Sequence, residues 1–342
     1  MTAKDPPLPQ PGRHLALDDY ASGVLGRDRP VLGKAITLIE SSRPDDQRLA
    51  QELLERLAPH TGQSIRVGIT GVPGAGKSSL IEVLGCRLTG AGHRVAVLAV
   101  DPSSPLSGGS ILGDRTRMTR LSAEPNAYIR PSPSGLTPGG VARKTREAML
   151  LCEAAGYDVV LVETVGVGQA EAAVADMTDF FLVLLITGAG DELWTMKRGL
   201  LELADLVAIA KADGENRSRA ELEAARVRHV LQVVRGSGEG REGPPAVVTC
   251  SAVDGTGLDV IWQTVLGRRQ ELDRTGQLQE RRRAQAVRWM WALVDEGVQR
   301  ALGAGHRVRD AVGAAEKGVR DGSVTPSRGA AVILAALGLP SG

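Results

Sequence analysis

Short runs of apolar residues, many of them β-branched, recur through the middle of the chain between Ile65 and about Gly267. Six runs have the length of strands: 65–70 (IRVGIT), 94–100 (RVAVLAV), 157–163 (YDVVLVE), 180–187 (FFLVLLIT), 206–210 (LVAIA) and 246–249 (AVVT). Their apolar residues are continuous rather than alternating, as in strands that are covered on both faces. Stretches with helical spacing separate the runs. The pattern predicts an α/β fold with a mostly parallel sheet and flanking crossover helices.

Both flanks of this central region have helical periodicity. Residues 20–57 are spaced as helices and predict a small N-terminal helical extension. Towards the C-terminus, apolar residues recur at steps of four and three along one helical face: Val287, Trp291, Val294 and Val298. That helix could pack on its own domain, or it could protrude as an arm against a second subunit. The pattern alone leaves both open.

The composition is that of an ordinary soluble protein. Among 342 residues, 41 Lys and Arg stand against 40 Asp and Glu, so no overall charge attracts nucleic acid or anionic lipid. The basic run 281–283 is typical of a solvated helix start. The longest apolar run, 180–186, is too short to span a bilayer, and the N-terminus lacks the apolar stretch of a secretory signal. The three cysteines form no CxxC pair. We expect a cytoplasmic protein without nucleic-acid or membrane partners.

A complete G-x-x-x-x-G-K-S motif, GVPGAGKS, occupies residues 71–78 between the strand 65–70 and a helical stretch. Its glycines allow backbone N–H groups to face phosphate oxygens, and the N-terminus of the next helix favours their charge. Lys77 is expected to reach the β- and γ-phosphates, and Ser78 to bind Mg²⁺. The predicted nucleotide-binding residues here are Gly71, Val72, Pro73, Gly74, Ala75, Gly76, Lys77, Ser78 and Ser79.

Acidic residues close two of the predicted strands. Asp101 follows the run 94–100, and Glu163 ends the run 157–163. Together with Ser78 they are the predicted Mg²⁺ ligands. Glu163 also opens a segment that resembles the usual D-x-x-G turn with Glu in place of Asp, and there Gly166 would offer its N–H to the γ-phosphate.

Two segments rich in Gly, Ser and Pro, residues 101–110 and 132–140, lie beside these predicted phosphate-site residues. Their composition cannot build a packed core, but γ-phosphate and Mg²⁺ could order them. We therefore predict that they are switch segments. Plain surface loops are the alternative.

A Lys-x-Asp pair directly follows the strand 206–210, and a later strand ends in TCSA at residues 249–252. The Asp213 carboxylate can accept hydrogen bonds from N1–H and N2–H of guanine, which adenine does not offer. The stem of Lys211 can lie along the base. Backbone N–H groups near Ser251 and Ala252 can meet O6. These features predict a guanine nucleotide, GTP or GDP, as the ligand.

The residue in front of this lysine is Ala210, where a guanine-binding site normally carries Asn. An Asn side chain would add a polar contact and brace the loop. Its loss costs about 1 kcal/mol of binding energy, judged as one hydrogen bond. We expect weaker nucleotide binding with the preference for guanine retained.

Four segments together resemble the methylmalonyl-CoA mutase-associated GTPases of the MeaB/ArgK type: residues 68–85, 98–118, 163–171 and 188–214. The resemblance extends from about residue 20 to the C-terminus. It implies a P-loop G-domain of the signal-recognition/MinD-like (SIMIBI) class between two helical parts. The domains expected from it are an N-terminal helical extension at 1–60, the G-domain at 61–270, and a C-terminal helical dimerisation arm at 271–342.

The resemblance also implies a function. Such proteins are GTP-hydrolysing chaperones of adenosylcobalamin-dependent acyl-CoA mutases, foremost methylmalonyl-CoA mutase; they gate cofactor loading and protect the mutase from inactivation. By resemblance, Asp101, Asp114 and Glu163 form an acidic set around the metal and the attacking water. Lys197 would belong to a switch that senses the mutase.

Three positions depart from the family pattern. Ala210 replaces the usual Asn, Thr187 replaces Pro, and Trp194 replaces Gln. The first bears on nucleotide affinity and the other two on coupling to the mutase.

Three other functions remain open. A metal-insertion GTPase for nickel enzymes would need Cys or His ligands near the switch, and the five His and three Cys are scattered. A P-loop kinase linked to arginine/ornithine transport would use the same phosphate loop. A non-hydrolysing interaction module is the third.

Overall fold

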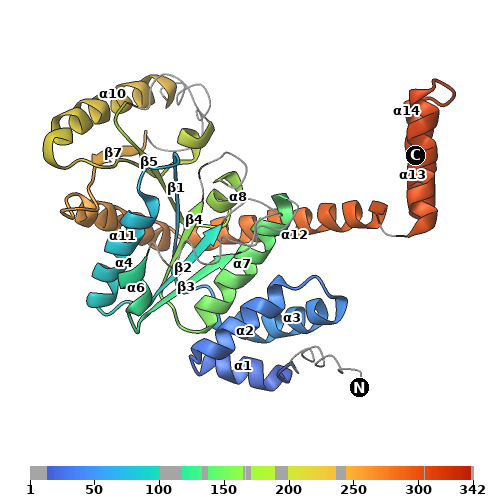
Figure 1. The fold of residues 1–342 in the computed structure, drawn as a ribbon, viewed down its shortest axis with the longest axis horizontal. Helices are drawn as coiled ribbons and strands as arrows, with labels where there is room; N and C mark the ends of the chain where they lie inside the picture. The colour runs from blue at the N-terminus through green and yellow to red at the C-terminus, as the bar shows by residue number, and fades with distance from the viewer. Residues whose placement is uncertain are drawn as a thin grey trace, which may run out of the picture. The chain divides into compact units, whose positions relative to one another are not determined.

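A computed structural model describes residues 14–100, 118–132, 138–164, 166, 171–188, 199–235, 244–303 and 305–339. The chain forms two compact units, Met1–Thr275 and Gly276–Gly342. The first contains the sheet, and the second is helical (Figure 1).

Within the described residues, seven parallel strands form one sheet in the order β3-β2-β4-β1-β5-β6-β7. Their bounds are β1 Ile65–Gly71, β2 Val95–Val100, β3 Ala127–Ser132, β4 Val159–Thr164, β5 Phe180–Leu185, β6 Leu206–Ile209 and β7 Ala246–Thr249. The predicted α/β class with a parallel sheet is confirmed.

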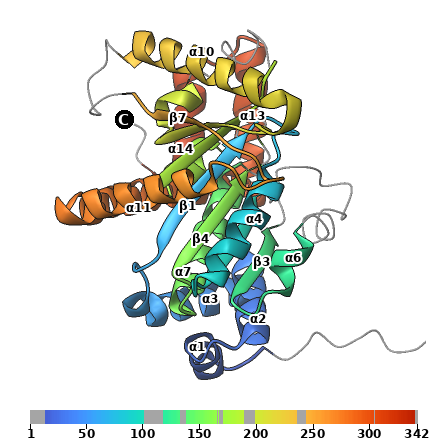
Figure 2. The same ribbon diagram turned by 90° about the vertical axis from the view of Figure 1, so that its left-hand side faces the viewer.

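Successive residues of each strand face two different cores, which explains the continuous apolar runs. In β2, Ala96 and Leu98 lie in one core and Val95 and Val97 in the other, all fully buried. Helices α1 Leu17–Leu25, α2 Arg29–Glu40, α3 Pro44–Leu57, α7 Pro138–Ala154, α8 Glu171–Ala175 and α10 Arg217–Arg235 contribute to the first core. Helices α4 Lys77–Gly90, α6 Thr119–Ala123 and α11 Leu258–Arg274 contribute to the second. Figure 2 gives a second view of these layers.

Strand β3 is the strand that the apolar pattern did not predict. It contains Arg130 and Pro131 and pairs only with β2, at one edge of the sheet. Proline is tolerated on an edge strand because an N–H on the outer side has no partner to bond. Of the predicted switch segment 132–140, residues 133–137 lie outside the described residues and α7 begins at Pro138; proline is favoured in the first turn of a helix.

The N-terminal helices α1, α2 and α3 belong to the same compact unit as the sheet and pack on α7. They account for the helical periodicity predicted over residues 20–57. The predicted domain boundaries at residues 60/61 and 270/271 stay predictions.

The second unit contains α12 Gln277–Gly303, α13 His306–Arg320 and α14 Pro326–Ala336. Helices α13 and α14 pack against each other near Gly329, where an added Cβ would lie 3.0 Å from Val319 Cγ2. The apolar stripe predicted on α12 is exposed, with Trp291 at 58% and Val287 at 53%. In the described residues, every helix is too short or too polar to cross a lipid bilayer.

Candidate nucleotide site

The phosphate loop connects the end of β1 to the start of α4. Gly74 and Gly76 have φ angles of +77° and +88°, which favour glycine. A Cβ at either position would meet nothing within 4 Å. Beside the loop there is therefore open space, as a phosphate cradle requires. At Gly71, by contrast, a Cβ would lie 2.3 Å from the carbonyl oxygen of Leu184 in the neighbouring strand β5.

Lys77, at the first position of α4, is buried and folds back over the loop. Its Nζ donates to the carbonyl oxygens of Gly71 at 3.0 Å and Val72 at 3.2 Å. The ammonium charge is thereby held at a helix N-terminus, where backbone N–H groups also attract anions. This combination suits a polyphosphate.

Ser78 and Glu163 come together from different elements. Glu163 lies in β4, which pairs with β1 so that Glu163 stands beside Ile69. Ser78 Oγ donates to Glu163 Oε1 at 2.8 Å, and the glutamate is 7% exposed. A hydroxyl and a carboxylate are hard oxygen donors of the kind that Mg²⁺ prefers, so this pair fits that ion. Among the described residues no cluster of three or more His, Cys, Asp or Glu could hold a metal.

Gly166, which follows β4, lies directly against the phosphate loop. Gly166 has a φ of +87°, and a Cβ there would lie 1.9 Å from the Gly71 carbonyl oxygen and 3.4 Å from Lys77 Nζ. Any larger residue would push the backbone at this position away from the loop. The predicted γ-phosphate residue is therefore adjacent to the predicted cradle.

Asp213 and Ser251 meet where the chain leaves β6 and β7, which are neighbours in the sheet. Ser251 is fully buried, and its Oγ donates to Asp213 Oδ2 at 2.6 Å while accepting from Val253 N at 3.0 Å. Backbone bonds join the same two loops, with Ala212 N donating to Cys250 O at 3.0 Å. The carboxylate is thus held in one orientation before any base arrives.

The lysine of the Lys-x-Asp pair has an unusual backbone. Lys211 has a φ of +60°, one of two positive values outside glycine among the described residues. Ala210 before it is buried, and its N–H donates to the Leu185 carbonyl at 2.7 Å. Asn216 Nδ2 donates to the Lys211 carbonyl at 2.7 Å. The sequence patterns did not identify Asn216, because it belongs to no motif.

The predicted residues, together with Asn216, thus form two groups along the edge where parallel strands end. The phosphate end (Gly71–Ser79, Glu163 and Gly166) follows β1 and β4. The base end (Lys211, Asp213, Asn216, Ser251 and Ala252) follows β6 and β7, with β5 between. Three predicted site residues lie outside the described residues: Asp101, Asp114 and Lys197.

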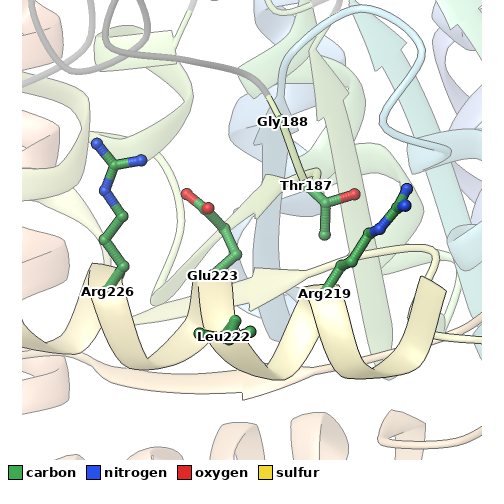
Figure 3. A pocket seen from close by; sticks show the side chains of 6 residues that line it. All are labelled: Thr187, Gly188, Arg219, Leu222, Glu223 and Arg226. Atoms are coloured by element: carbon green, nitrogen blue, oxygen red, sulfur yellow. The ribbon is translucent and has the colours of Figure 1, made fainter.

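A hollow of about 440 Å³ lies beside the base end. Figure 3 shows Arg219, Leu222, Glu223 and Arg226 on α10, with Thr187 and Gly188 across from them. Thr187 follows β5 and is also hydrogen-bonded to Asn216. The hollow therefore borders the loop that would hold the base.

A parallel sheet with this phosphate loop and this Lys-x-Asp loop defines a P-loop GTPase. The chain belongs to the family described as "Methylmalonyl Co-A mutase-associated GTPase MeaB", which it matches over residues 32–306. The resemblance seen in the sequence is confirmed.

Relatives agree with this assignment. A Mycobacterium tuberculosis protein named a "probable GTPase" is 52% identical, over 93% of this chain and 94% of its own. A mouse protein, "Methylmalonic aciduria type A homolog, mitochondrial", is 44% identical over 94% of this chain and 79% of its own. The solved structure of an "LAO/AO transport system kinase" superposes with a TM-score of 0.73 at 36% identity, covering 93% of this chain and 96% of that one.

Proposed function

We propose that the protein hydrolyses GTP to GDP and phosphate. One observation carries the proposal: a glycine loop closed by Lys77 and a carboxylate oriented by Ser251 stand on the same edge of one sheet. The first suits a polyphosphate, and the second suits the N1–H and N2–H edge of guanine.

At the phosphate end, the loop N–H groups would bind the phosphate oxygens. Lys77 Nζ would exchange its two carbonyl partners for the β- and γ-phosphates. Mg²⁺ would be held by Ser78, Glu163 and Asp101, and it would neutralise charge on the β- and γ-phosphates. Gly166 N–H would position the γ-phosphate.

At the base end, Asp213 would accept from N1–H and N2–H of guanine while Ser251 holds the carboxylate in place. The backbone N–H of Ala252 would donate to O6, and the Lys211 stem would cover one face of the base. Adenine would leave the Asp213 carboxylate without these donors, which costs about 1–3 kcal/mol for each unmet group.

Catalysis would come from positioning and charge neutralisation, as in other phosphoryl-transfer enzymes. Asp114 would belong to the acidic set near the attacking water, and Lys197 to a switch that senses a partner. No described residue is assigned to orient the water. Slow turnover that a partner accelerates is the expected behaviour.

The partner we propose is an adenosylcobalamin-dependent acyl-CoA mutase, first of all methylmalonyl-CoA mutase. The family description supports this partner. The protein would act as its chaperone in the cytoplasm, gating the loading of the cofactor and protecting the mutase from inactivation.

We also propose a homodimer formed through the C-terminal helices. The support is the exposed stripe on α12, in which Val294 and Val298 are 46% and 41% exposed. Exposed apolar patches of this kind commonly mark protein interfaces. Sedimentation velocity tests the proposal: a dimer that Trp291→Glu converts to a monomer supports it, and a monomeric wild type contradicts it.

The mutase role is tested by pull-down from the native cell extract with the protein loaded with a non-hydrolysable GTP analogue. The expected result is recovery of an acyl-CoA mutase, reduced when the bait is Lys77→Ala. Recovery of no cobalamin enzyme by the loaded wild type contradicts the role. Hydrolysis of GTP and ATP measured side by side tests the reaction, and equal rates contradict the assignment of Asp213.

A kinase is the second candidate, because the related solved structure carries that name. It would transfer the γ-phosphate to an amino acid or a protein instead of water. Incubation with γ-labelled GTP and arginine or ornithine separates the two reactions. Label in inorganic phosphate alone supports hydrolysis, and label on the amino acid supports the kinase.

A further inference from the structure

Asn216 joins the base end to the segment after β5, a connection that the recognised motifs do not make. It ends the short helix η2 (Gly214–Asn216), three positions after Asp213. Its Nδ2 donates to the carbonyl oxygen of Lys211 at 2.7 Å, and its Oδ1 accepts from Thr187 Oγ1 at 3.0 Å. One side chain thus ties the Lys-x-Asp loop to the chain that leaves β5.

The two bonds fix the orientation of the amide. The Lys211 carbonyl can only accept, so the Asn216 nitrogen must face it. The amide oxygen then points to Thr187, whose hydroxyl can donate. A flipped amide would bring two acceptor oxygens together at the Lys211 carbonyl. The Lys211 carbonyl therefore sets the direction in which Asn216 donates, and the Thr187 hydroxyl holds the amide oxygen on the other side.

The Lys211 backbone needs such a contact. Its φ of +60° lies in the left-handed region, which a residue other than glycine keeps only when its surroundings hold it there. The neighbours are anchored through their N–H groups, Ala210 to Leu185 O at 2.7 Å and Ala212 to Cys250 O at 3.0 Å. Ala210 has no polar side-chain atom with which to brace the loop. The bond from Asn216 acts on the strained residue itself.

We propose that Asn216, held by its hydrogen bond from Thr187, is a positioning residue for guanine recognition and supplies the loop brace that the side chain of Ala210 cannot give. Holding Lys211 in the left-handed conformation directs the next two residues, so the Asp213 carboxylate reaches Ser251 and faces the base. The phosphate end takes no part in this contact. The inference rests on the proposed binding of guanine nucleotide.

Binding of GDP, IDP and ADP, measured by titration calorimetry, tests the proposal. IDP lacks the exocyclic amine, and ADP lacks both donors to Asp213. With Asn216→Ala the dissociation constant for GDP should rise about tenfold, the effect of losing two modest hydrogen bonds, whereas that for ADP should change less than about twofold. The preference for GDP over ADP and over IDP should therefore fall.

Thr187 supplies the finer test. Thr187→Val replaces the hydroxyl by a methyl group and should raise the dissociation constant for GDP about threefold, as expected for one lost hydrogen bond. Thr187→Ser keeps the hydroxyl and should restore wild-type selectivity. Asn126→Ala, an exposed asparagine in the turn before β3, is the matched control and should leave all three dissociation constants unchanged.

The outcomes separate the two proposals. A wild-type protein that binds ADP as tightly as GDP refutes the guanine assignment and, with it, this inference. A wild type that prefers GDP refutes the inference alone when Asn216→Ala weakens GDP and ADP by the same factor or has no effect. If Asn216→Ala lowers the unfolding temperature strongly, the milder variant Thr187→Val is used instead. The inference is then tested by the ratio of its dissociation constants for ADP and GDP, which should fall relative to the wild type.

Discussion

The phosphate end and the base end of the proposed site are built in different ways. The phosphate end is made mainly by one contiguous segment, 71–79, and the backbone conformation of that segment determines the shape of the cradle. The base end is assembled from the segments after β6 and β7 and is connected to the segment after β5. Side-chain hydrogen bonds hold these segments together: Thr187 to Asn216, Asn216 to Lys211, and Ser251 to Asp213.

This difference bears on how each end tolerates substitution. A backbone cradle depends on glycines at fixed positions, so its pattern stays visible in the sequence. An assembled site has several contacts that stabilise one loop, and a second side chain can replace one that is missing. In this chain the glycine pattern of the phosphate loop at 71–78 is intact. At the base end, by contrast, the usual Asn in front of Lys211 is replaced by Ala210. The following variants probe the two ends, from the largest expected effect to the smallest.

Removing the charge at the phosphate end should have the largest effect. Lys77→Ala leaves the β- and γ-phosphates without their ammonium partner, and kcat for GTP hydrolysis should fall about 10²–10³-fold. Steady-state phosphate release measures it. Lys34→Ala, an exposed lysine on α2, is the control and should keep wild-type kcat. Wild-type turnover by Lys77→Ala would contradict the assignment.

Changing the base end should alter selectivity more than turnover. Asp213→Ala removes the acceptor for N1–H and N2–H, so the ratio of kcat/KM for GTP over ATP should fall about 10²-fold. The rate of ATP hydrolysis should stay close to that of the wild type. Asp45→Ala, which removes an exposed carboxylate on α3, is the control and should leave the ratio of kcat/KM for GTP over ATP unchanged. An unchanged ratio would mean that the base lies elsewhere.

A methyl group at the turn after β4 should separate that turn from the phosphate loop. Gly166→Ala places a Cβ 1.9 Å from the Gly71 carbonyl at a φ of +87°. The free energy of unfolding should fall by about 1–3 kcal/mol, and GDP should bind more weakly. Gly267→Ala in α11, where a Cβ meets nothing within 4 Å, is the matched control. It should raise stability by up to about 1 kcal/mol. Equal effects of the two variants in urea titrations would contradict this packing.

Restoring an asparagine should have the smallest effect. Ala210→Asn adds a polar side chain beside Lys211, and the dissociation constant for GDP should fall about fivefold, in keeping with one hydrogen bond. The gain should be larger when Asn216 is replaced by Ala, because the loop then lacks its other brace. A gain of the same size in both backgrounds, measured by calorimetry, would show that the two positions act independently.

The sequence predicted the contiguous features well. Continuous apolar runs located six strands, and β3 was missed because Pro131 and Arg130 interrupt its pattern. The phosphate loop and the Lys-x-Asp pair were visible because each is a short motif. The proximity of Ser78 and Glu163 was expected from their roles, although they are 85 positions apart.

The contact between Thr187 and Asn216 could not be predicted in the same way. It joins residues 29 positions apart through a single hydrogen bond. Thr187 stood out only as a departure from the family pattern, and Asn216 belongs to no motif. The hydrogen bond forms only because the folded sheet brings the residue after β5 close to the loop after β6. Asp101, Asp114 and Lys197 lie outside the described residues, and their roles stay predictions.

A crystal structure with GDP and Mg²⁺ tests the central claim most directly, because it locates both ends of the ligand at once. The account predicts the β-phosphate within about 3 Å of Lys77 Nζ and the loop N–H groups, and guanine N1 and N2 within about 3 Å of the Asp213 carboxylate. A diphosphate bound outside the loop at 71–78, or a base bound away from Asp213, would contradict it.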